Sequence, residues 1–198
     1  MGRYDVHEER DHIEHPIVGR FLFGSHIYDV ANLESDKDYI VAIVAPEGTM
    51  YNTKDFEGND YVCYSYADFK NAIRAHKVQM LEIYFYYELF AIEFKLDLKL
   101  LRKEFSSVAS NSYVKCKKKI ADGEVYIGLK SLYHSLRILT YAIQIAKHGR
   151  IVDFDVANVY YKQIMSIGGD WEKLHKTFKP IYNGLKSELR ALAPLEGK

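Results

Sequence analysis

The sequence has few of the residues that mark specialised protein classes. Cys63 and Cys116 are its only cysteines among 198 residues, too few for a disulfide framework and without the spacing of a metal site. We therefore expect a reducing compartment. Its 27 basic and 27 acidic side chains cancel. This balance excludes a general polyanion-binding surface, so any contact with nucleic acid must come from a local basic patch.

A long hydrophobic run is also lacking. The most apolar region, residues 81–94, is interrupted by Glu82, Glu88 and Glu93, which excludes a membrane span of about 20 apolar residues. Residues 1–15 are polar and charged, without the apolar core of a secretory signal. We expect a cytoplasmic protein with no membrane contact.

The chain is long and apolar enough to bury a substantial core, since 48% of its residues are hydrophobic and 14% are aromatic. β-Branched and aromatic content predicts strands at residues 17–23, 39–45 and 60–64. Between the last two, residues 46–59 contain glycine and asparagine and are interpreted as a loop or hairpin connection.

Helical patterns dominate the second half of the chain. The clearest lies at residues 127–148, where Leu132, Leu136, Leu139 and Ile143 form one apolar stripe that ends before Gly149. Further helices are expected at residues 65–76, 94–105, 155–167 and 170–192, the last bent or restarted at its proline. Residues 79–105 as a whole are ambiguous between helix and strand. Strands followed by helices predict an α+β fold.

Two acids stand one residue apart at the start of a predicted strand. Asp36 and Asp38 would point to one face, where like charges repel unless a cation lies between them. Asp60, at the start of the next predicted strand, could complete a two-metal site. Earlier in the chain, Gly24 and Ser25 offer close backbone approach and a hydroxyl to a phosphate. Without those partners, the two acids would equally fit a solvated loop that leads into a strand.

In this arrangement the sequence resembles the nucleotidyltransferase superfamily that includes DNA polymerase beta, whose signature is Gly-Ser followed by Asp-x-Asp on a strand. More narrowly, it is similar to a group of nucleotidyltransferases associated with RNA repair. The matching stretches are FLFGSHIYDVANLESDKDYIVAIV, DYVCYSYADFKNAIRAHKVQMLEIYF and KSLYHSLRIL. The resemblance implies a small mixed sheet with the nucleotidyltransferase fold in residues 1–105, followed by a helical region, residues 106–198, packed on that core.

The resemblance also assigns roles to the acids and to the Gly-Ser pair. It implies that the triphosphate of a nucleotide lies on Gly24 and Ser25. The catalytic acids, which would hold Mg²⁺ or Mn²⁺, are Asp36, Asp38 and Asp60. The sequence departs from the family at Asp29, which follows Tyr28 where the family usually has a glycine. An acid there could weaken nucleotide binding, or could point away from the triphosphate.

A further motif lies on the predicted helix 127–148. Lys130, His134 and Arg137 match the family's Lys-x-x-x-His-x-x-Arg helix, which the resemblance implies would bind the nucleotide and face its phosphates. The alternative is that these residues, with Tyr141, form the solvated face of an amphipathic helix.

A basic run precedes this helix, at Lys115, Lys117, Lys118 and Lys119. Such a run is usually a solvated face or a helix end. It is also our candidate for contact with the phosphate backbone of an RNA or DNA acceptor.

Together these features predict a Mg²⁺-dependent nucleotidyltransferase that moves a nucleoside monophosphate from an NTP to an acceptor hydroxyl, with RNA favoured over protein as the acceptor. Two alternatives stay open. One is a catalytically weak or inactive protein that binds nucleotide for regulation. The other is a toxin-like enzyme that modifies proteins.

Overall fold

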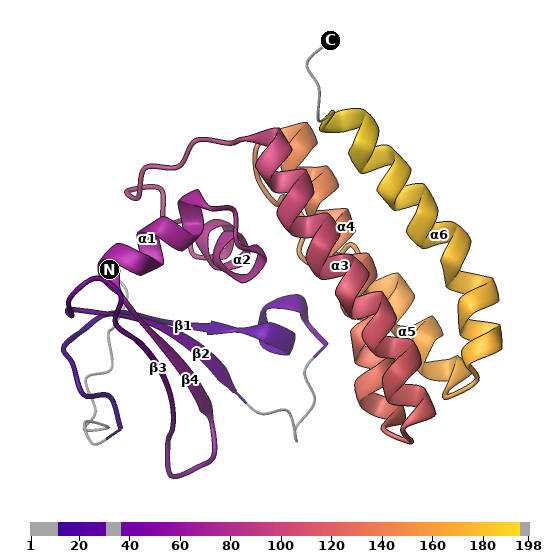
Figure 1. Ribbon diagram of the computed structural model, residues 1–198, viewed down its shortest axis with the longest axis horizontal. Coiled ribbons are helices and arrows are strands. Elements are labelled where there is room, and N and C mark those ends of the chain that lie inside the picture. Colours follow the sequence, from indigo (N-terminus) through magenta and orange to yellow (C-terminus); the bar gives the residue numbers. More distant parts are fainter. Residues whose placement is uncertain (1–11, 31–36, 195–198) are drawn as a thin grey trace.

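The structure is a computed structural model and describes residues 12–30 and 37–194. A four-stranded mixed sheet is followed by helices, which confirms the predicted α+β class. The sheet and two short helices form one side of the molecule, and longer helices pack beside them (Figure 1). Within the described residues, no helix is long and apolar enough to cross a membrane.

The sheet has the strand order β1-β2-β4-β3. Its strands are β1 (Ile17–Phe23), β2 (Asp38–Ile43), β3 (Met50–Lys54) and β4 (Asp60–Ser65). The central pair, β2 and β4, is parallel, and the two outer pairings are antiparallel. The parallel pairing sets Asp38 directly opposite Asp60 at the start of both strands.

β3 lies inside the segment that the sequence suggested was a loop or hairpin connection. Its residues alternate between exposed and half-buried, and it is an edge strand that bonds to β4 alone. An edge strand needs little apolar content, because one of its sides faces water. Pattern analysis therefore missed it.

The helical elements begin directly after β1 and β4. They are η1, a 3-10 helix (Gly24–Tyr28), α1 (Tyr66–Arg74), α2 (Val78–Tyr86), α3 (Leu98–Ala121), α4 (Val125–His148), α5 (Asn158–Ile167) and α6 (Trp171–Leu192). The predicted cap of α1 is present, since the Ser65 side chain accepts a hydrogen bond from the Asp68 backbone N–H at 3.1 Å. Gly149, in the left-handed conformation, ends α4 as expected.

Two helices differ from the prediction. The ambiguous stretch 79–105 divides into α2, an irregular segment and the first part of α3. α3 continues without a break past residue 105, where a boundary between the core and the helical region was predicted, and it includes the lysine run. The long helices therefore begin at Leu98 rather than at residue 106. Pro180 lies inside α6, which neither ends nor restarts there.

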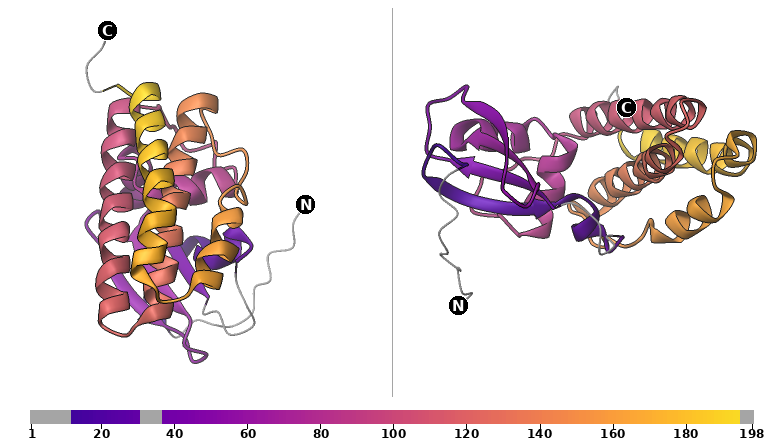
Figure 2. Two further views of the ribbon diagram at one scale, coloured as in Figure 1. Left: turned by 90° about the vertical axis from the view of Figure 1, so that its right-hand side faces the viewer. Right: turned by 90° about the horizontal axis from the view of Figure 1, so that it is seen from below.

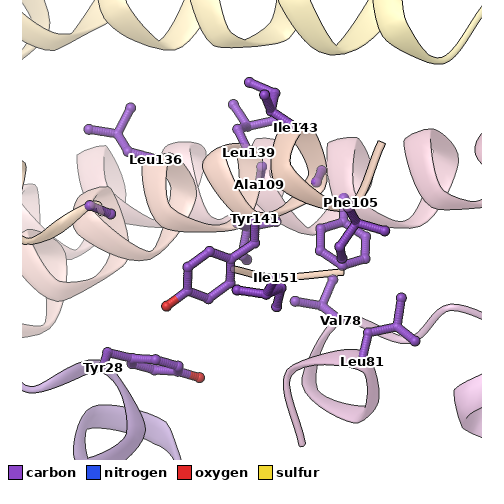
Figure 3. Packing of buried hydrophobic residues seen from close by; sticks show 14 of the residues in the cluster. Tyr28, Val78, Leu81, Phe105, Ala109, Leu136, Leu139, Tyr141, Ile143 and Ile151 are labelled. Atoms are coloured by element: carbon purple, nitrogen blue, oxygen red, sulfur yellow. The ribbon is translucent and has the colours of Figure 1, made fainter. Parts of the chain in front are cut away.

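One large hydrophobic cluster joins the sheet to the helices. It includes Ile40 of β2, Leu81 of α2, Phe105 of α3 and Leu139 of α4, and Figure 3 shows the last three among the side chains of this cluster. The alternate residues of β2 face a smaller cluster on the other side of the sheet. Since both halves of the chain share the large cluster, the sheet and α4 are held in a fixed relation.

Candidate active site

A pocket opens where the sheet meets the helices, and its volume of about 470 Å³ lies in the range of small-molecule sites. We call it the sheet–helix pocket. It is lined from one side by the end of β1, η1 and the start of β2, and from the other by α2, α3, α4 and α5. The predicted site residues among its lining are Gly24, Ser25, Asp38, Lys115, Lys130, His134 and Arg137.

Gly24 stands where the chain leaves β1, next to the first residue of β2. Its φ of +75° favours glycine, and a Cβ built there would lie 3.1 Å from Asp38 Oδ2. Phe23, just before it, pairs with Asp38 across the β1–β2 ladder. The Gly-Ser turn and the Asp38 carboxylate are therefore in close contact, and no larger residue fits at Gly24 without displacing that carboxylate.

The three predicted acids have different surroundings. Asp38 lines the pocket. Asp60 is its partner in the β2–β4 register, but its carboxylate forms an ion pair with Lys54 at 3.0 Å and does not line the pocket. Asp36 lies outside the described residues. Within residues 12–30 and 37–194, no group of three or more His, Cys, Asp or Glu is placed to hold a metal, so the two-metal site stays a prediction.

On α4, Lys130, His134 and Arg137 all line the pocket. Lys130 is exposed, with its Nζ 5.4 Å from the centre of the Tyr126 ring. Arg137 and Tyr141 are fully buried. The interpretation of this stripe as a solvated helix face is therefore wrong for Arg137 and Tyr141, while Lys130 is exposed. The reason is that α4 is enclosed by α3, α5 and α6 as well as by the pocket.

The charge of Arg137 is balanced inside the protein. Its Nη1 donates to Glu82 Oε1 at 2.7 Å, and both side chains are fully buried. Tyr28 donates a hydrogen bond to the same carboxylate, and the guanidinium carbon lies 3.4 Å from the centre of the Tyr28 ring. Burial alone would lower the pKa of Arg137, but Glu82 holds it above its ordinary value. Arg137 is thus a fixed positive charge at the pocket wall.

Glu82, which holds Arg137 in place, was not predicted from the sequence, where it only interrupts an apolar run. An acid inside an otherwise apolar helix is itself a signal, because a buried carboxylate requires a partner. The partner, Arg137, is 55 residues away in the sequence, so the pairing could not be inferred from spacing.

His134 is neutral in this environment. Arg137 Nη2 donates to His134 Nδ1 at 2.7 Å, since a guanidinium can only donate. Burial, together with the charge of Arg137, lowers the pKa of His134 to about 3. A neutral ring that accepts at Nδ1 carries its proton on Nε2. His134 therefore brings a hydrogen-bond donor, not a positive charge, to the pocket.

A polar chain ties α5 to η1 beside the pocket. The Tyr133 hydroxyl donates to Asn158 Oδ1 at 2.8 Å, and Asn158 Nδ2 donates to the Tyr28 carbonyl at 2.8 Å. The Tyr28 ring also lies 6.2 Å from that of Tyr141, and Figure 3 shows the two tyrosines facing each other between η1 and α4. These contacts hold the Gly-Ser turn at a fixed distance from α4.

The four lysines of the basic run on α3 face different surroundings. Lys115 lines the pocket, whereas Lys119 forms an ion pair with Glu124 at 2.6 Å. Lys117 and Lys118 are exposed. The run is therefore not a single patch, because successive helical residues point in different directions.

Asp29, the departure from the family pattern, is exposed and does not line the pocket. Its φ of 54° is left-handed, a conformation that glycine adopts most readily and that aspartate tolerates. Its carboxylate faces Asp155, where burial and then the charge of Asp29 raise the pKa of Asp155. Of the two readings given above, the structure favours the one in which Asp29 points away from the pocket.

The pocket thus sets a carboxylate and a glycine turn opposite two lysines, a buried arginine and a neutral histidine. The cations and the histidine N–H on one wall can bind phosphate oxygens, and the carboxylate on the other wall can bind a metal ion that those phosphates also hold. The pocket therefore suits a ligand that carries several phosphates and a metal ion. In sequence comparisons, no protein-family model matches the chain and no curated protein matches it.

Proposed function

We propose that the protein is a metal-dependent nucleotidyltransferase whose NTP lies in the sheet–helix pocket. The observation that carries this proposal is the convergence, in one pocket, of Gly24, Ser25 and Asp38 from the sheet with Lys130 and Arg137 from α4. These groups are far apart in the sequence and belong to the two motifs of the family resemblance. A chance match of motifs would not require them to meet.

The chemistry follows from the two walls of the pocket. The backbone N–H groups and hydroxyl of the Gly24–Ser25 turn bind triphosphate oxygens, and Lys115 and Lys130 neutralise their charge. His134 donates from Nε2. Asp38, with Asp36 and Asp60 as the resemblance implies, would hold Mg²⁺ or Mn²⁺ through carboxylate oxygens, and the ion would supply charge stabilisation to the phosphates.

In the reaction, the acceptor hydroxyl attacks the α-phosphorus of the NTP. A bond from the acceptor oxygen to phosphorus forms, and the bond from phosphorus to the oxygen that bridges to the β-phosphate breaks. Pyrophosphate leaves with the electron pair, and the proton of the hydroxyl passes to solvent. Lys130 stabilises the charge that develops on the leaving group. Arg137, already paired with Glu82, positions His134 and the turn rather than providing a full free charge.

The test is incubation with each α-labelled NTP, Mg²⁺ and RNA, with pyrophosphate release measured in parallel. Asp36→Asn/Asp38→Asn should abolish both label transfer and pyrophosphate release while leaving the fold intact. Asp29→Asn is the matched control, because it removes a carboxylate near the pocket that does not line it, and asparagine tolerates the same backbone conformation. Equal activity in the double variant would overturn the proposal.

A second candidate function is nucleotide binding without transfer. It is favoured by the ion pair of Asp60 with Lys54, which engages the third acid outside the pocket. Under this alternative, calorimetry detects binding of an NTP with Mg²⁺, but no pyrophosphate is released even over long incubation. Release that depends on Asp36 and Asp38 would rule it out.

A further inference from the structure

A second concave surface lies between α3 and α6. These two helices run side by side on the part of the molecule away from the sheet (Figures 1 and 2). Two hollows between them, of about 520 and 580 Å³, share Lys186 and Arg190 and so form one continuous groove. We call this the α3–α6 groove. It takes no part in the function proposed above.

The groove is strongly basic. Its cationic lining residues are Lys99, Arg102, Lys103, Lys179, Lys186 and Arg190, and no acid lines it. Across residues 12–30 and 37–194, none of these six forms an ion pair with a carboxylate, whereas Lys77, Lys119 and Lys147 of the surrounding surface do. A chain with zero net charge therefore carries a concentrated positive surface here.

The charges form rows along the two helices. On α3, Lys99 and Lys103 are one turn apart, and Ser106 and Ser110 continue the same face at spacings of three and four. Lys117, seven residues after Ser110, extends this face beyond the groove. On α6, Lys186 and Arg190 are again one turn apart. From Lys99 to Val114, the α3 side of the groove spans about 22 Å at 1.5 Å per residue.

A row of cations and hydroxyls of this length suits a linear ligand with regularly spaced negative charges. Phosphate contacts of nucleic-acid-binding proteins come mainly from lysine, arginine and small polar side chains. About 22 Å corresponds to about six stacked nucleotides. Tyr113 and Tyr182 lie beneath Lys179 and are almost fully buried, so their rings are not open to stacking with bases. Contact is thus limited to the backbone.

We propose that the α3–α6 groove binds a nucleic-acid strand through its phosphate backbone, without base specificity. This inference does not rest on the proposed nucleotidyl transfer, because it uses other residues and a binding measurement. The groove and the sheet–helix pocket lie on different faces of α3, since Ser110 and Val114 line the first and Ser112 and Lys115 line the second.

The test is fluorescence anisotropy of labelled single-stranded RNA and DNA about twelve nucleotides long, which is about twice the length of the groove. We expect both to bind, with log affinity falling linearly with log salt concentration by about 0.7 per phosphate contact. Lys103→Glu/Arg190→Glu should weaken binding by at least about tenfold and reduce that slope by about 1.4. Lys103→Gln/Arg190→Gln, which removes charge without reversing it, should act in the same direction.

The matched control is Lys70→Glu/Arg74→Glu, which makes the same charge change on α1, where neither residue lines the groove. It should leave affinity within about twofold, because neither side chain lines the groove and a nearby exposed charge is screened by salt. Circular dichroism and thermal unfolding check that all variants are folded. Absence of binding to either oligonucleotide, or equal losses in the groove and control variants, would overturn the proposal.

Discussion

The two concave regions of the protein hold positive charge in opposite ways. In the sheet–helix pocket, Arg137 is buried and balanced by Glu82, and it keeps His134 neutral. In the α3–α6 groove, the cations are held in rows at the surface without acidic partners in the described part of the chain. The first arrangement fixes donor positions for a small ligand, and the second gives a long-range, salt-sensitive attraction. One helix, α3, contributes to both.

The largest expected effect comes from breaking the buried pair. Glu82→Gln leaves the Arg137 charge buried without a counter-charge, which should lower the free energy of unfolding by about 3–5 kcal/mol. Urea unfolding measures this. Glu188→Gln is the control, because it breaks the half-exposed Lys147–Glu188 pair and should cost less than about 1 kcal/mol. Similar losses in the two variants would show that Arg137 is not the fixed internal charge described here.

The start of α3, which lines the groove, depends on His76. This side chain is buried, donates from Nδ1 to the Arg74 carbonyl at 2.8 Å and accepts at Nε2 from the Asp97 N–H at 2.9 Å. His76→Asn tolerates the positive φ but loses these bonds, so we expect a loss of about 1–3 kcal/mol in the free energy of unfolding.

The same residue predicts a pH dependence of stability. Burial lowers the pKa of His76, so the unfolded chain binds the proton more readily than the folded one. The stabilisation is complete above the unfolded pKa of about 6.5 and is lost as the pH falls below it. Urea unfolding between pH 8 and pH 5 (about the range in which histidine titrates) should show a steeper decline for the natural protein than for His76→Asn. His134, whose pKa is lowered too, contributes to the remaining decline. Equal slopes would contradict this account.

Gly24→Ala separates backbone strain from damage to the pocket. Its positive φ costs about 1–2 kcal/mol for alanine, and the new Cβ crowds Asp38. Gly48→Ala has a similar φ of +88° with nothing within 4 Å, so it should cost similar stability. Calorimetry should find weaker NTP binding for the Gly24 variant alone. Weaker binding in both would mean that strain, rather than contact with Asp38, is responsible.

The smallest expected effects distinguish two lysines of the basic run, Lys115 and Lys117, by the ligand whose affinity each one changes. Lys115→Glu should weaken NTP binding severalfold, because Lys115 lines the pocket, and should change oligonucleotide affinity less. Lys117 lies on the groove face of α3. Lys117→Glu should therefore weaken oligonucleotide binding and change NTP binding less. Parallel titrations with an NTP and with an oligonucleotide check both. If the two variants behave alike, the run acts as one patch.

The sequence predicted the fold class and the groups of the pocket because their signals are local. β1 is bounded by Pro16 and Gly24, and the helical repeat of Leu132, Leu136 and Leu139 identified α4. Gly-Ser, Asp-x-Asp and the α4 motif are short motifs of fixed spacing. Gly24, Ser25, Asp38 and the α4 motif line one pocket, whereas Asp60 does not line it and Asp36 lies outside the described residues.

The features that escaped prediction are long-range. Glu82 and Arg137 become partners only when α2 packs on α4, and burial of the polar stripe depends on neighbours that surround α4 on several sides. The α3–α6 groove combines residues from Lys99 to Arg190, and no local pattern joins them. Helix α3 itself has a weak amphipathic pattern, with lysines over much of its surface, so its extent past residue 105 was not apparent.

The most direct test of the account is a crossed calorimetric titration with an NTP and Mg²⁺. The natural protein should bind, Asp38→Asn should lose at least about tenfold in affinity because Asp38 lines the pocket, and Lys103→Glu/Arg190→Glu should bind as tightly as the natural protein. If Asp38→Asn binds normally while the groove variant loses the nucleotide, the sheet–helix pocket is not the nucleotide site.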